Sequence, residues 1–211
     1  MNDNSKEKLI GENKPLLEQI EILEKILLQN KILKQVLTIL SESNLTNYYI
    51  GAGAINQTVF NYYHDYDLDY GIKDFDIVYF DPDTSYEKED SVIQYVKKLL
   101  KDIPIEYDIK NEARVPIWYP EKFGKTILPY KNVEDAISSW GTSVTCIGVR
   151  LENNKLVVCA PYGLNDIFSM TIRPIKKQFM REAYLEKTKN WKKKWPLLTV
   201  LPWNDEDWGN R

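Results

Sequence analysis

The chain has 211 residues, a formal net charge of -3 and a pI near 5.4. Hydrophobic residues make up 43% and charged residues 28%, so the chain can bury a sizeable core and is not a disordered segment. Its acidic balance gives no general attraction to DNA or RNA, and we therefore expect no long nucleic acid among its partners.

The N-terminal residues lack the apolar core of a signal peptide, and no run approaches the ~20 apolar residues of a membrane span. We expect a cytoplasmic protein with no membrane partner. The two cysteines, Cys146 and Cys159, are too few for a disulfide framework and are wrongly spaced for zinc, so both are interpreted as structural.

The first part of the chain favours helices followed by a strand and a tight turn. Residues 14–43 repeat apolar side chains at helical spacing, with a break near Asn30, which predicts two helices or one kinked helix. We expect residues 1–44 to form an N-terminal helical segment packed on the core formed by residues 45–211. A strand over 45–50 then meets Gly51-Ala52-Gly53, and a helix is predicted over 54–63.

A strand–helix–strand pattern follows a polar loop over 65–71. The apolar run 74–80 predicts a strand, residues 85–101 predict a helix that Pro104 ends, and residues 105–109 alternate as a strand does.

The last part of the chain mixes a loop, a hairpin and helices. Residues 116–130 are expected to form a long ordered loop and residues 132–140 a short helix. Residues 144–151 and 156–159 predict a β-hairpin, residues 175–193 a C-terminal helix, and residues 203–208 a tail. The pattern is α+β, with a small mixed β-sheet flanked by helices.

Two aspartates give the strongest chemical signal. Asp74 and Asp76 lie on one face of their predicted strand, roughly 6.7 Å apart, because side chains alternate along a strand. At that distance two unit charges repel by roughly 2.5 kcal/mol at an effective dielectric near 20. A divalent cation would turn this repulsion into attraction, and ligands that are all oxygen favour Mg²⁺ or Mn²⁺.

The glycine turn allows two interpretations. It could open a Rossmann dinucleotide site with Asp74 on the ribose, but Asn56 occupies the place of the third glycine and no series of βαβ units follows. Alternatively, the turn and the N-terminus of the next helix hold a nucleotide's phosphates, while a neighbouring strand presents metal-binding carboxylates.

The second interpretation is the layout of the polymerase beta-like nucleotidyltransferases, and it implies a third carboxylate on an adjacent strand. Asp108 fits because neighbouring strands lie about 4.8 Å apart. Glu106 shares its strand face and stays an alternative.

The chain resembles the bacterial nucleotidyltransferase family proteins whose substrate is generally unassigned. The likeness covers about residues 45 to 203 and is carried by these segments: YYIGAGAINQTVFNYYHD, KDFDIVYFDPD, YDIKNEARVPIWY, APYGLNDIFSMTIRP and KNWKKKWP. It implies a polymerase beta-like nucleotidyltransferase fold, with Asp74, Asp76 and Asp108 as catalytic residues and ligands of Mg²⁺ or Mn²⁺. The nucleotide-binding candidates are Gly51, Ala52, Gly53, Asn56, Lys110, Asn111 and Arg114.

The sequence departs from this family at several positions. Members often carry Arg and Asn where this chain has Asn56 and Gln57, and Gln where it has Glu112. Ala52 also lacks the hydroxyl that a serine in the turn would offer to a phosphate.

The resemblance implies that the protein transfers a nucleoside monophosphate from an NTP to a hydroxyl group and releases pyrophosphate. The acceptor is not readable from the sequence, and a small molecule is favoured over a protein or an RNA. A catalytically inactive nucleotide-binding or antitoxin-like interaction module is the alternative.

Overall fold

The computed structural model describes residues 8–204 and is built on a five-stranded sheet in the order β3-β2-β1-β4-β5. The strands are β1 Tyr48–Gly51, β2 Asp74–Tyr79, β3 Glu106–Asn111, β4 Gly148–Glu152 and β5 Lys155–Cys159. Neighbouring strands are antiparallel except β2 and β3, which are parallel. The helix α4 (Tyr86–Leu99) makes the crossover that a parallel pair requires. The expected α+β class with a mixed sheet is confirmed.

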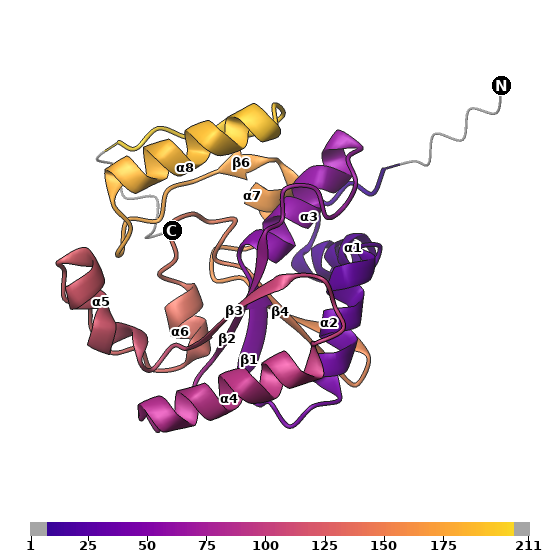
Figure 1. The fold of residues 1–211 in the computed structure, drawn as a ribbon. Coiled ribbons are helices and arrows are strands. Elements are labelled where there is room, and N and C mark those ends of the chain that lie inside the picture. Colours follow the sequence, from indigo (N-terminus) through magenta and orange to yellow (C-terminus); the bar gives the residue numbers. More distant parts are fainter. Residues whose placement is uncertain (1–7, 205–211) are drawn as a thin grey trace.

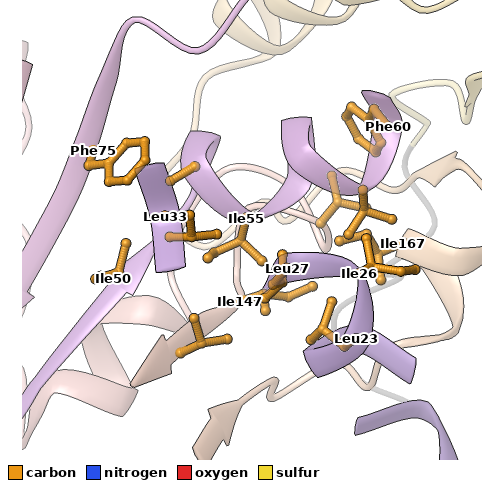
Figure 2. Packing of buried hydrophobic residues seen from close by; sticks show 14 of the residues in the cluster. Leu23, Ile26, Leu27, Leu33, Ile50, Ile55, Phe60, Phe75, Ile147 and Ile167 are labelled. Carbon is orange, nitrogen blue, oxygen red and sulfur yellow. The ribbon is translucent and has the colours of Figure 1, made fainter. Parts of the chain in front are cut away.

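The helices α1 (Leu16–Leu27), α2 (Lys31–Ser41) and α3 (Gly53–His64) carry much of the main core. The break between α1 and α2 lies at Asn30, whose side chain caps α2 by accepting a hydrogen bond from the N–H of Leu33. Figure 2 shows side chains of α1 and α3 packing together with Ile50 of β1 and Phe75 of β2. One face of the sheet is therefore covered by apolar side chains.

The opposite face of the sheet holds a smaller apolar cluster. Tyr49 of β1 and Val78 of β2 pack there against α6 (Val133–Ile137), which Asn132 caps. Figure 1 shows α5 (Val115–Phe123) and α6 on one side of the strands and α1 and α2 on the other. Beyond this small cluster, the second face is free to carry polar side chains.

Three sequence predictions about the later part of the chain are corrected. Part of the expected loop over 116–130 is the helix α5, in which Pro116 occupies the first turn, where no intrahelical N–H donor is needed. The C-terminal helix α8 spans Arg181–Lys194 and begins later than expected, since Ile175 and Pro174 are engaged with the backbone near Gly141 and Thr142. The first hairpin strand begins at Gly148.

Three short elements were not predicted from the sequence. They are α7 (Asn165–Phe168), β6 (Thr171–Ile172) and β7 (Thr199–Val200), and β6 and β7 form a separate two-stranded parallel sheet. The expected tail over 203–208 lies largely outside the described residues. Among the helices of residues 8–204, none is long and apolar enough to cross a bilayer.

Candidate active site

The acidic residues of β2 and β3 form one row across the parallel strand pair. The register places Asp76 beside Asp108 and Asp74 beside Glu106. Directly paired residues of neighbouring strands project from the same face of a sheet. That face is opposite the main core, which receives the alternate residues Phe75 and Ile77. Both candidates for the third carboxylate therefore share a face with the aspartate pair, and Asp108 is the one beside Asp76.

The glycine turn lies at the end of the neighbouring strand. Gly51 of β1 is paired with Asp76, so the turn begins next to the acidic row. A Cβ at Gly51 would lie 2.7 Å from the ring of Trp140, and this close approach explains the need for glycine. Ala52 has φ 47° and ψ -121°, a conformation that normally requires glycine. The helix α3 begins at the next residue.

A pocket of about 400 Å³ joins the turn to the acidic row. Its polar lining includes Asp76, Lys110, Glu112 and Lys187, and Ala52 lies at its edge. The aromatic lining comes from α5 and from segments further along the chain: Trp118, Tyr119, Phe123, Tyr130, Trp140 and Phe179. This volume falls within the range of small-molecule sites.

Burial and neighbouring charges change the acid–base properties of the pocket. Burial raises the pKa of Asp76 to about 6, and the nearby carboxylates of Asp108 and Asp74 add to that rise while Lys110 opposes it. Burial also raises the pKa of Glu112 to about 7. On α8, burial lowers the pKa of Lys187, although the negative charge of Asp76 favours its charged form. Groups with such perturbed pKa values are typical of functional sites.

Asp108 forms an ion pair with Lys110, which follows it two residues along β3. This contact and the carboxylate of Asp76 outweigh the effect of burial and raise the pKa of Lys110. Among residues 8–204, no three His, Cys, Asp or Glu side chains are gathered closely enough to form a metal cage. The carboxylate row therefore lies beside a lysine that competes with any incoming cation.

Of the expected nucleotide-binding residues, only Ala52 and Lys110 line the pocket. Asn56 is fully buried and its amide donates to the carbonyl of Val144. The side chain of Asn111 is also buried, and it bonds to the backbone of the segment that follows β2. Arg114 pairs with Glu89 of α4 at 3.2 Å. Gly51 and Gly53 flank Ala52 in the turn but are not among the lining residues.

Sequence reasoning missed two charged pocket residues. Nothing local in the sequence marks Lys187, because α8 has a low apolar content and no obvious buried stripe. Glu112 was noted only as a departure from the related sequences, although its side chain is just 4% exposed. The available sequence signal for Glu112 was its position two residues after Lys110, in a segment that turns back into the core.

Comparison with known proteins identifies the family and the fold. A family model described as Nucleotidyltransferase matches residues 38–200. An NMR structure described as a CCA-adding enzyme head domain is 26% identical to this chain, with a TM-score of 0.68, covering 86% of this chain and 95% of the other. No curated protein matches. The likeness confirms the polymerase beta-like nucleotidyltransferase fold, and because the family model covers most of its length, the chain belongs to the nucleotidyltransferase family.

Proposed function

We propose that the protein is a metal-dependent nucleotidyltransferase that moves a nucleoside monophosphate from an NTP to a hydroxyl acceptor. The observation that carries this proposal is the register that puts Asp76 beside Asp108 and next to the turn after Gly51. Ala52 of the turn and Asp76 line one pocket, whereas Asp74 and Asp108 do not line it, so a triphosphate at the turn would have its α-phosphorus near Asp76.

The donor atoms are of the type that Mg²⁺ or Mn²⁺ prefers, but among residues 8–204 the carboxylates do not form a preassembled cluster. Asp74, Asp76 and Asp108 would hold the ions, since they share one sheet face and offer only oxygen ligands. Burial is the main cause of the raised pKa of Asp76, and the negative charges of Asp108 and Asp74 add to it, so a bound cation would favour its ionised form. When bound, divalent ions would supply neutralisation of the triphosphate's negative charge and of the charge that develops on pyrophosphate.

The chain's own residues would position the two substrates. The first N–H groups of α3, at Gly53 and Ala54, have no intrahelical acceptor and would donate to a phosphate at the turn. Lys187 brings a positive charge to the Asp76 end of the pocket. Lys110 would exchange its partner Asp108 for a phosphate oxygen, which frees that carboxylate.

The reaction we infer is an in-line displacement. The acceptor oxygen forms a bond to the α-phosphorus, the bond from that phosphorus to the bridging oxygen breaks, and pyrophosphate leaves with the electron pair. Asp108 is placed to take the hydroxyl proton, because it is beside Asp76 in the row. Positioning and charge neutralisation contribute most of the rate.

The ion pair between Asp108 and Lys110 favours one alternative, a nucleotide-binding module without transfer activity. In that case Lys110 would hold the third carboxylate permanently, and NTP would bind without a metal. Calorimetric titration of NTP with and without Mg²⁺ separates the two. The enzyme requires metal-dependent binding that Asp74→Asn and Asp76→Asn abolish, whereas the module predicts binding that neither change affects.

Transfer itself is tested by incubating the protein with α-labelled NTPs, Mg²⁺ or Mn²⁺, and a cell extract separated into small molecules, RNA and protein. We expect label in the small-molecule fraction. The structural likeness to a CCA-adding enzyme head domain makes the RNA fraction the second arm of the test. Asp102→Asn, an exposed carboxylate far along the sequence from β2, serves as the matched control for Asp76→Asn. If no fraction is labelled with either metal, the proposed transfer is wrong.

A further inference from the structure

The pocket contains a buried carboxylate that the transfer chemistry does not use. Glu112 follows β3 directly, its side chain is only 4% exposed, and it lines the pocket. Within residues 8–204, no lysine, arginine or histidine forms an ion pair with it, and the two nearest cations in sequence, Lys110 and Arg114, pair with Asp108 and Glu89. A buried carboxylate without a cationic partner is costly, and a cationic ligand would recover much of that cost.

The walls around this carboxylate are aromatic. Trp118 and Tyr119 of α5 line the pocket together with Tyr130, and Phe179 lies on its α8 side. Aromatic faces attract cations, and the pocket already holds one example, because the ammonium of Lys187 lies 5.8 Å from the centre of the Phe179 ring. A pocket lined by both a carboxylate and aromatic rings suits an organic cation.

The positive charges of the pocket are not spread evenly. Lys110 acts on the pKa of both Asp76 and Glu112, whereas Lys187 acts only on that of Asp76. Since Lys110 is held by Asp108, the Glu112 end of the pocket is the more negative one. The pocket thus offers an end for phosphates at Asp76 and an end for a positive group at Glu112.

We propose that Glu112 and the aromatic wall bind a positively charged group of the acceptor, so that the acceptor is a small hydroxylated organic cation. The role of this cation as the acceptor rests on the proposed function, whereas its binding to the pocket does not. A nucleobase is the competing occupant, and it is the less favoured one because it carries no positive charge to set against Glu112.

The test uses choline and its uncharged isostere 3,3-dimethylbutan-1-ol, which differ only in the charged centre. Binding of each is measured by NMR shift changes in the full chain, with Mg²⁺ present and no nucleotide, at about pH 8.5 so that Glu112 is ionised. We expect choline to bind at least tenfold more tightly than the isostere. Equal binding of the two probes, or binding of neither, would overturn the proposal.

Variants locate the site of binding. Glu112→Gln keeps the shape and is expected to abolish the preference for choline, while Glu121→Gln, an exposed carboxylate of α5, is expected to leave it unchanged. If Glu112→Gln does not fold, Trp118→Leu is the second variant, and it should weaken choline binding more than isostere binding. A preference that survives Glu112→Gln but not Asp76→Asn would assign the cation to the acidic row and refute the assignment.

Competition distinguishes acceptor from nucleobase. A non-hydrolysable NTP with Mg²⁺ is expected to bind together with choline, and displacement of choline by the nucleotide would refute the acceptor assignment. Because no turnover is measured, a protein that fails the labelling experiment can still pass this one. The failure of the two proposals can therefore be told apart.

Discussion

Replacing Asp76 by asparagine is expected to stabilise the protein while it abolishes metal-dependent nucleotide binding. The pKa of Asp76 rises from 3.8 to about 6, a change of about 2 units, and one unit corresponds to about 1.4 kcal/mol. The full shift is thus about 3 kcal/mol, and we expect about 2 kcal/mol because the pocket is open to solvent. For a chain of this size that is about 4–8 °C in Tm.

The sign of the effect depends on pH. Because the pKa of Asp76 is raised in the folded protein, the native state binds more protons than the unfolded state between pH 3.8 and about 6. The stability of the wild type therefore falls as pH rises through that window. Asparagine does not titrate, so the advantage of Asp76→Asn should be absent below about pH 4 and complete above about pH 7.

Urea unfolding of both proteins at several pH values is the assay. Asp102→Asn is the control and should change little at any pH, since its side chain is exposed and lies in a turn. The reasoning is refuted if Asp76→Asn is no more stable than the wild type at neutral pH, or if its advantage is the same at pH 4. Added Mg²⁺ should stabilise the wild type and not the variant, because a ligand stabilises only the state that binds it.

Three further changes test the turn and the ion pair. Ala52→Gly should raise the free energy of unfolding by about 1 kcal/mol, because it relieves the positive φ. A lower free energy of unfolding, measured by urea titration, would contradict this. Gly51→Ala should cost about 1–3 kcal/mol, because its Cβ would meet the ring of Trp140, and the near-ultraviolet circular dichroism should change with it. Lys110→Met should tighten Mg²⁺ binding and weaken NTP binding in calorimetry by releasing Asp108, and an unchanged Mg²⁺ affinity would show that the ion pair does not compete.

The elements that could be predicted from the sequence are those in which apolar side chains recur at a clear, regular spacing. Apolar residues alternate along the strand β2 and recur at helical spacing along α4, and Asn30 is a recognisable helix cap. The face shared by Asp74 and Asp76 follows from the alternation of a strand alone. The exact pairing of Asp76 with Asp108 does not, because register depends on how the crossover helix packs.

The elements that could not be predicted lack such a local signal. The helix α5 contains Pro116 and Pro120, and its aromatic residues give no apolar stripe, so local propensity favours a loop. Its helical form is accompanied by ring contacts such as the one between Tyr119 and Phe123, whose centroids lie 4.6 Å apart. The pocket position of Lys187 is likewise set by tertiary packing, since it depends on where α8 lies relative to the sheet.

The β2–α4–β3 unit supplies the acidic row as well as Lys110 and Glu112, all from one uninterrupted stretch of chain. The surrounding walls come instead from α5, from the segment near Trp140 and from α8. Under the proposed function, substitutions in those walls would alter which molecule is selected without altering the acidic row. Substrate choice and chemistry would then depend on separate parts of the polypeptide, and such a scaffold could be retargeted by substitutions outside the β2–α4–β3 unit.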